Sequence, residues 1–130
     1  MSTLNVASVQ STGSSPTLFK NSSGTEVGEL CRAWVNFDGT GTVTIGDSFN
    51  VSSITDNGTG DYEVNFTNPM SNANYCANLS YSDDVLAGVS HCVGYVPEQN
   101  ASYVRILIHN DTNFNQLVDK SIVNVAVFGS

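Results

Sequence analysis

Apolar side chains recur at every second residue through most of this chain, and a period of two is the pattern of half-buried β-strands. The clearest run spans residues 30–38, where Cys31, Ala33, Val35 and Phe37 share one face. Turns rich in Gly, Asn and Asp separate such runs, and no segment keeps the 3.6-residue period of an amphipathic helix. The sequence therefore predicts an all-β fold, an antiparallel β-sandwich with a jelly-roll-like arrangement.

The remaining runs locate the other strands. Phe49, Val51 and Ile54 are assigned to one strand, and residues 56–61 (D-N-G-T-G-D) to a tight turn. Residues 85–96 form a flatter apolar run that is expected to be buried on both faces, and residues 113–120 are expected to hold a short helical turn. The inward sets predicted by alternation are Tyr62, Val64 and Phe66; Tyr75, Ala77, Leu79 and Tyr81; Val104, Ile106 and Ile108; and Val123, Val125 and Val127.

Residues 1–28 differ from the rest because small polar residues dominate them and apolar residues are sparse. Such a segment cannot bury enough surface to fold alone. It is predicted to be an extended N-terminal arm that becomes ordered on another surface, and the alternative is a chain end without fixed structure. Residues 29–130 are predicted to form the sandwich domain. The apolar residues proposed to anchor the arm are Leu4, Val6, Val9, Leu18 and Phe19.

Some strands also carry large apolar residues on the face that alternation assigns to the outside. Trp34 lies opposite the inward set of residues 30–38, and Ile122 and Phe128 lie opposite the three valines of the last run. A two-layer sandwich buries only one face of each strand, so these three residues are predicted to contact another protomer. The alternative is that they are isolated exposed apolar side chains, which are common on monomers.

Composition excludes several functional classes. Charged residues are only 12% of the chain, the formal net charge is −8, and the four Lys/Arg residues are scattered. Binding to nucleic acid or to an anionic membrane is therefore not expected. The segment 88–92 (G-V-S-H-C) lacks the second Gly of a nucleophile elbow, and 111–115 (D-T-N-F-N) lacks the later ligands of a calcium loop. We therefore expect the protein to have no enzymatic activity and to bind no metal ion or cofactor.

The number and spacing of the cysteines indicate the redox compartment in which the protein is made. Cys31, Cys76 and Cys92 are an odd number and form no C-x-x-C pair. This pattern is weak for a disulfide framework or a zinc site, so reduced thiols in a protein made in a cytosol are expected.

Two long stretches carry a resemblance. Residues 31–43 (C-R-A-W-V-N-F-D-G-T-G-T-V) and 48–67 (S-F-N-V-S-S-I-T-D-N-G-T-G-D-Y-E-V-N-F-T) resemble a β-sandwich family of tailed-phage virions, with A-W-V-N-F-x-G-T-G-T-V followed by N-V-S-S-I-T-D-N-G-T-G-D-Y. The resemblance covers roughly residues 15–75. It implies a trimeric β-sandwich without catalytic residues on the virion of a cyanophage or another environmental phage, made in the host cytoplasm. The family includes distal domains of tail fibres and tailspikes and related capsid cement (decoration) proteins.

The resemblance leaves two functions open. The first is a trimeric capsid cement protein, whose N-terminal arm would hold onto the major capsid protein of the lattice. This function is favoured because the chain looks complete and lacks a stalk. The second is the receptor-binding tip of a tail fibre or tailspike, which would recognise host-surface polysaccharide. In that case Tyr81, Tyr95 and Tyr103 are the residues expected to stack on sugar rings, and the alternative for them is packing in the core or on a strand face.

Overall fold

The computed structural model describes residues 8, 18–82, 92–110 and 116–129, and the structural statements below concern that part of the chain. This part contains antiparallel β-strands and no helix, which confirms the all-β prediction. It accordingly includes no helix with the length and apolarity needed to cross a membrane. The chain divides into two compact units, residues 1–30 and residues 31–130, which are described separately.

In the first unit, the described residues form a small hairpin. Strand β1 (Leu18–Lys20) pairs antiparallel with β2 (Glu26–Glu29). The turn between them is built on Asn21, whose side-chain oxygen accepts hydrogen bonds from the backbone N–H of Ser23 and of Thr25, each at 3.0 Å. Asn favours such a turn because its short side chain mimics a backbone acceptor. Part of the predicted arm thus forms a hairpin of its own, and its ordering on another surface stays a prediction.

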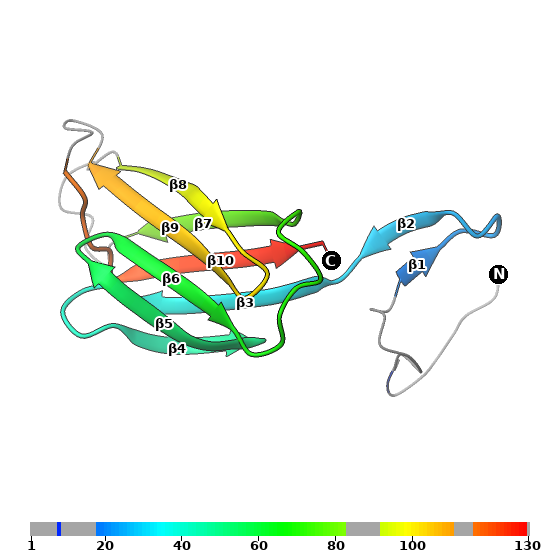
Figure 1. Ribbon diagram of the computed structural model, residues 1–130, viewed down its shortest axis with the longest axis horizontal. Helices are drawn as coiled ribbons and strands as arrows, with labels where there is room; N and C mark the ends of the chain where they lie inside the picture. Colours follow the sequence, from blue (N-terminus) through cyan, green and yellow to red (C-terminus); the bar gives the residue numbers. More distant parts are fainter. Residues whose placement is uncertain (1–7, 9–17, 83–91, 111–115, 130) are drawn as a thin grey trace. The chain divides into compact units, whose positions relative to one another are not determined.

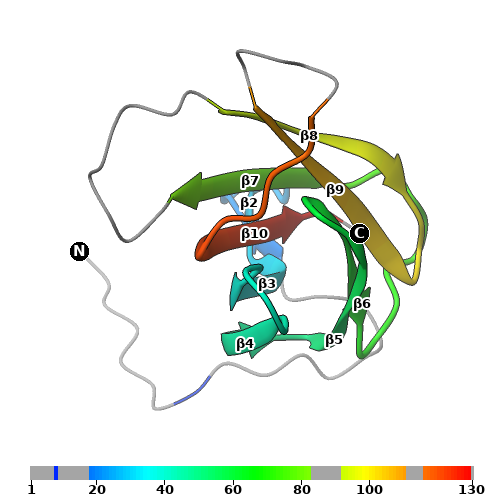
Figure 2. The same cartoon turned by 90° about the vertical axis from the view of Figure 1, so that its left-hand side faces the viewer.

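The second unit consists of two four-stranded antiparallel sheets that face each other (Figures 1 and 2). We call the sheet with strand order β4-β3-β10-β7 sheet 1, and the sheet with order β5-β6-β9-β8 sheet 2. The strand bounds are β3 Cys31–Asp38, β4 Thr44–Phe49, β5 Val51–Gly58, β6 Asp61–Phe66, β7 Cys76–Ser82, β8 Cys92–Gln99, β9 Tyr103–Asn110 and β10 Ile122–Phe128. Neighbouring strands of the chain pair as hairpins within a sheet three times, and β10 pairs with both β3 and β7 in sheet 1.

Both sheets contribute to one hydrophobic core. The predicted inward residues of β3, β6, β9 and β10 are almost completely buried, except Cys31 at the start of β3, which is half-buried. Tyr75 is buried just before β7. Ala77, Leu79 and Tyr81 of β7 are partly buried against the same core. The predicted inward faces are thus confirmed, because strict alternation leaves only one apolar face for each strand to bury. The buried apolar set is Ala33, Val35, Phe37, Tyr62, Val64, Phe66, Met70, Tyr75, Val104, Ile106, Ile108, Val123, Val125 and Val127.

Asn50 separates two strands that the sequence pattern had merged. Strand β4 ends at Phe49 in sheet 1, and β5 begins at Val51 in sheet 2. Asn50 adopts a positive φ of 55°, a conformation that Asn tolerates better than most residues. Its side-chain amide donates to the carbonyl oxygens of Arg32 and Asn68, each at 3.1 Å, and its Oδ1 accepts from the N–H of Asn68 at 2.8 Å. These bonds fix the corner at which the chain changes sheets.

Tyr62 closes one end of the core. Its side chain is completely buried and packs edge-on against Phe37, with ring centroids 5.2 Å apart. Its hydroxyl lies 2.9 Å from the carbonyl oxygen of Gly39 and 2.6 Å from Oδ1 of Asp119, and burial together with Asp119 raises its pKa above the ordinary value. Asp119 also accepts the N–H of Gly60 at 2.7 Å. Tyr62 and Asp119 together therefore connect three loops at this end.

Gly60 shows why the β5–β6 turn needs glycine. It has a φ of +64°, and a Cβ added there would lie 2.7 Å from the carbonyl oxygen of Ile108 and 2.8 Å from the backbone nitrogen of Val118. The backbone of three segments meets at this point, so a side chain has no room. The predicted tight turn at residues 56–61 is confirmed, with Gly58 paired to Asp61.

Two further expectations were wrong for the residues that can be compared. From Cys92 onward, β8 alternates half-buried and exposed side chains and is not buried on both faces. Residues 116–120 are not helical, because Leu117 forms a bridge with His109 and the N–H of Val118 donates to Ile108. Residues 83–91 and 111–115, on which the rest of both expectations falls, lie outside the described residues.

Candidate functional site: an apolar sheet face and an aromatic platform

Large apolar side chains gather on the outer face of sheet 1, the face away from the core. Trp34 and Phe49 lie directly opposite each other on β3 and β4 and are 36% and 55% exposed. Phe128, at the end of β10, is 37% exposed. Residues opposite each other in a sheet share a face, so these aromatic rings project to the same side. Phe49 was missed as an outward residue because the sequence pattern placed it in the following strand.

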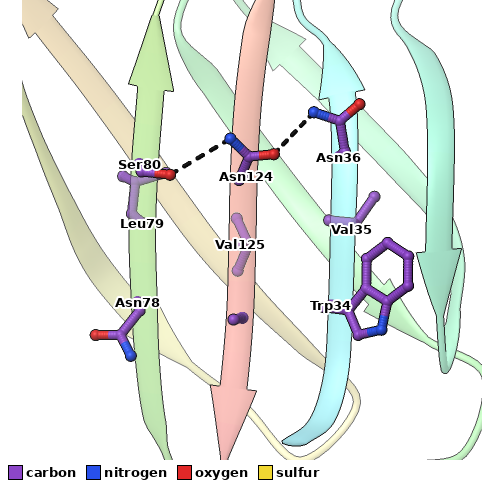
Figure 3. Close-up of a pocket in the computed structure, with 9 residues that line it drawn as sticks. Trp34, Val35, Asn36, Asn78, Leu79, Ser80, Asn124 and Val125 are labelled. Atoms are coloured by element: carbon purple, nitrogen blue, oxygen red, sulfur yellow. Dashed lines mark hydrogen bonds between the residues drawn. The ribbon is translucent and has the colours of Figure 1, made fainter.

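A shallow hollow of about 270 Å³ lies beside Trp34 on this face (Figure 3). It forms because Ala126, which is paired with Trp34 on one side and with Asn78 on the other, carries only a methyl group. The large indole beside this small side chain leaves a space into which one side chain of a binding partner could fit. The residues that line the hollow are Trp34, Val35, Asn36, Asn78, Leu79, Ser80, Asn124, Val125 and Ala126.

A row of hydrogen-bonded polar side chains borders the hollow. The Asn36 amide donates to Oδ1 of Asn124 at 2.8 Å, and the Asn124 amide donates to Oγ of Ser80 at 3.4 Å (Figure 3). The row crosses three strands without a charged group. It can therefore be covered by another surface at a lower desolvation cost than a charged row.

The three residues predicted at an oligomer interface share this outer face. Ile122 and Phe128 lie at opposite ends of β10, and Trp34 is paired with Ala126 between them. Ile122 is half-buried, whereas Trp34 and Phe128 are exposed. The outward positions of β10 are Ile122, Asn124, Ala126 and Phe128, and none of them is ionisable. The centre of the face is thus neutral in a chain with a net charge of −8.

Sheet 2 carries a different outer face, dominated by an aromatic stack. The rings of Tyr95 on β8 and His109 on β9 lie 5.2 Å apart with an interplanar angle of 21°, and the Tyr95 hydroxyl is 3.1 Å from Nε2 of His109. Tyr95 is 45% exposed, and Val93 beside it is also exposed. Leu107, which pairs with Tyr95, is half-buried. We call Val93, Tyr95, Leu107 and His109 the aromatic platform.

The three tyrosines predicted to contact sugars have different surroundings. Tyr95 belongs to the aromatic platform. Tyr103 is half-buried on β9, and its hydroxyl donates to the carboxylate of Glu98, which raises the tyrosine's pKa. Tyr81 packs partly buried against the core, and its hydroxyl donates to the carbonyl oxygen of Cys92 at 2.6 Å. The geometry of Tyr81 matches the alternative of core packing, so it is not part of the platform.

A charged cluster lies next to the aromatic platform. Arg105 binds Asp61 through two hydrogen bonds, Nε to Oδ1 at 2.8 Å and Nη2 to Oδ2 at 2.6 Å. The hydrogen bond from Arg105 lowers the pKa of Asp61 and so keeps this carboxylate ionised. Arg105 is also paired in register with Glu63 on β6 and Glu98 on β8. The cluster therefore contains one guanidinium and three carboxylates.

The cysteines are free thiols, and their positions exclude a bridge between Cys31 and Cys76. Both are paired in register with Phe128, one from each side of β10. Two strand spacings put their Cα atoms about 9.5 Å apart, beyond the reach of a disulfide. Among the described residues no group of three or more His, Cys, Asp or Glu side chains could hold a metal ion.

The predicted arm residues can be placed only in part. Leu4, Val6 and Val9 lie outside the described residues, as do the two sequence segments weighed for chemistry at 88–91 and 111–115. Leu18 and Phe19 lie on β1, and the Phe19 side chain is exposed.

Comparison with known proteins gave no relatives: no protein-family model, no curated protein and no solved structure matches the chain.

Proposed function

We propose that this chain is a structural protein of a tailed-phage virion, a homotrimeric cement protein that binds the major capsid protein and stabilises the outer capsid surface. The observation that carries the proposal is the outer face of sheet 1. There Trp34, Phe49 and Phe128 are exposed, and Trp34 borders a hollow lined by uncharged side chains. The resemblance of residues 31–43 and 48–67 to phage virion modules supplies the biological setting, and these residues form most of β3–β6.

Electrostatics supports self-association through this face. Each copy carries a net charge of −8, so contact between two acidic faces would be repulsive. The outward side of β10 has no ionisable group, and the aromatic rings beside it are the residue types that anchor protein interfaces. Three copies arranged around an axis with their sheet 1 faces inward would bury Trp34, Ile122 and Phe128 together, which is the contact expected of a trimer.

Attachment to the capsid is assigned to the first unit, residues 1–30, with Leu4, Val6, Val9, Leu18 and Phe19 as its apolar contacts. A protein with four Lys/Arg residues can offer few cations to a partner, so the contact would be mainly apolar and hydrogen-bonded. A cement protein stabilises the shell because it binds the assembled lattice in preference to its dissociated subunits. The gain grows with the ratio of free concentration to Kd.

Removal of residues 1–30 tests this assignment. We expect the remaining protein to melt cooperatively and to keep its trimer mass, because the core lies entirely within residues 31–130. Its binding to stripped capsids should fall by at least about tenfold, and capsids mixed with it should stay sensitive to heat. The measurements are light scattering, thermal melting and cosedimentation with capsids.

A full-length variant with Leu4→Ser, Val6→Ser and Val9→Ser is the matched control, since it keeps chain length and removes apolar contacts. It should behave like the truncated protein in the capsid assay. Undiminished binding of the truncated protein would refute the assignment to residues 1–30. A truncated protein that does not fold would show that the boundary between the two units is wrong.

The receptor-binding tip of a tail fibre or tailspike is the second candidate. The aromatic platform on sheet 2 favours it, because an exposed ring held by a neighbouring side chain is a common element of sugar-binding surfaces. This candidate predicts few copies on each virion, whereas cement predicts many.

A further inference from the structure

We propose that Arg32 of one copy pairs with Asp47 of the next copy where the outer faces of sheet 1 meet, and that this ion pair sets the direction in which the copies pack. The proposal rests on the proposed function only in taking sheet 1 as the face through which copies associate. The observation behind it is that Nη1 of Arg32 is buried and has no hydrogen-bond partner in the described part of the chain.

Arg32 lies near the beginning of β3, at an irregular point of sheet 1. The register between β3 and β10 shifts here, so that Arg32 has no opposite residue on β10. The side-chain amide of Asn50 donates to the backbone carbonyl oxygen of Arg32 at 3.1 Å, which fixes the main chain at this position. Alternation along β3 places the Arg32 side chain on the outer face of the sheet, the face of Trp34.

The guanidinium of Arg32 needs an acceptor from outside the copy. A buried N–H group without an acceptor is unfavourable, because it has lost its contact with water and gained no hydrogen bond. Arginine keeps its charge in proteins, so it cannot remove this cost by losing a proton. The side chain as a whole is only half-buried, so a group of another molecule can reach it. A carboxylate is the best match, since it can accept two N–H groups of a guanidinium at once.

The carboxylates in the strands of sheet 1 are too far from Arg32 to pair with it within one copy. The charged residues of these four strands are Arg32, Asp38 and Asp47. Asp47 is paired with Asn36, which is four residues along β3 from Arg32, a distance of about 13 Å. Asp38 lies two residues further along the same strand. A carboxylate of this face can therefore meet Arg32 only from a second copy.

Asp47 is the better placed of the two carboxylates. Its exposed side chain lies on the edge strand β4, on the same face as Asn36 at the border of the hollow. Its Oδ1 accepts the N–H of Ser48 at 2.8 Å, and a carboxylate can accept further N–H groups at its second oxygen. Asp38 is half-buried, and its Oδ1 already accepts the backbone N–H and the hydroxyl of Thr40, at 2.8 and 2.6 Å.

The positions of the two charges determine how the copies can pack. Copies whose β3 strands lay side by side in the same direction would bring Arg32 next to Arg32 and leave both unpaired. A contact between the Arg32 region of one copy and the Asp47 region of the next joins two different patches, and such heterologous contacts can close into a ring. In a ring of three, every Arg32 has an Asp47, which agrees with the proposed homotrimer.

The test reverses the two charges, separately and together, and measures the mass by light scattering over a dilution series. Arg32→Glu and Asp47→Lys should each weaken assembly by at least about tenfold, because two like charges then face each other. The double variant restores opposite charges and should assemble within about threefold of the unaltered protein. It also keeps the net charge of −8, so its recovery cannot come from a change in total charge.

Asp38→Asn is the matched control, because it removes the other carboxylate of the sheet 1 strands and keeps an acceptor for Thr40. Its assembly should not change. An equimolar mixture of the Arg32→Glu and Asp47→Lys proteins separates a ring of three from a two-fold pair. In a pair of unlike copies both contacts join opposite charges, whereas a ring of three keeps at least one contact between like charges. We therefore expect the mixture to recover assembly only in part.

Single variants that assemble like the unaltered protein, or a double variant that assembles no better than they do, would overturn the proposal and leave the trimer standing. A dimer with the same loss and recovery would support the ion pair and contradict the trimer. An unaltered protein that stays monomeric would contradict both. Melting curves check folding, and where a reversed variant does not fold, Arg32→Gln and Asp47→Asn take its place. Together these two should weaken assembly by less than the product of their separate effects.

Discussion

Replacing Tyr62 by Ala is expected to lower the free energy of unfolding of the second unit by about 3–5 kcal/mol, the usual cost of deleting a buried aromatic side chain. The ring is completely buried and packs against Phe37. Its hydroxyl is also the hydrogen-bond donor to the carbonyl oxygen of Gly39 and the carboxylate of Asp119, which would lose this donor. Since domains are stable by only about 5–15 kcal/mol, the loss would show as a large fall in the urea midpoint.

Tyr62→Phe separates the two contributions. It keeps the ring and removes only the hydroxyl, so we expect a cost of about 1–2 kcal/mol, the range for a lost hydrogen bond with buried partners. Urea unfolding followed by circular dichroism measures both variants. A Tyr62→Ala protein with nearly unchanged stability would contradict the placement of Tyr62 at the closed end of the core.

Trp34→Ala is expected to weaken trimer assembly by about 2 kcal/mol or more, as for a central anchor residue at an interface. The reason is that Trp34 forms the wall of the hollow over Ala126 and is the largest side chain among those that line it. The measurement is the mass by light scattering over a dilution series, in which the variant should dissociate at a higher concentration than the unaltered protein.

Tyr95→Ala is the matched control for Trp34→Ala, because it removes an exposed aromatic ring from the outer face of sheet 2. Its trimer mass should not change. A monomer mass for the unaltered protein across the whole dilution range would remove the role proposed for Trp34. Equal dissociation of both variants would show that the effect is not specific to the sheet 1 face.

The strands and their inward faces could be predicted because alternation in a sheet is a local property. Val35 and Phe37, or Val64 and Phe66, are two residues apart in the chain, and both members of each pair are buried. The outward position of Trp34 follows from the same count. The local pattern was therefore enough to predict the core residues and the outward positions of Trp34, Ile122 and Phe128 on sheet 1.

Features that depend on distant pairing could not be predicted in this way. The corner at Asn50 is one residue long and leaves the alternation of Phe49 and Val51 intact, so nothing in the period marks the change of sheet. The hollow forms because Trp34 and Ala126, which lie far apart in the sequence, are paired in sheet 1. The aromatic stack likewise forms because Tyr95 and His109 come together on neighbouring strands. Such pairings are set by sheet topology, which periodicity does not encode.

The proposed function is tested most directly by the copy number of this chain in purified virions, measured by quantitative mass spectrometry against the major capsid protein. A cement protein occupies a site repeated over the whole shell, so the account predicts a ratio to the major capsid protein of the same order as that of the shell subunits themselves. A ratio like that of tail components, together with capsids that lose no stability when the protein is removed, would contradict the cement role and favour the receptor-binding tip.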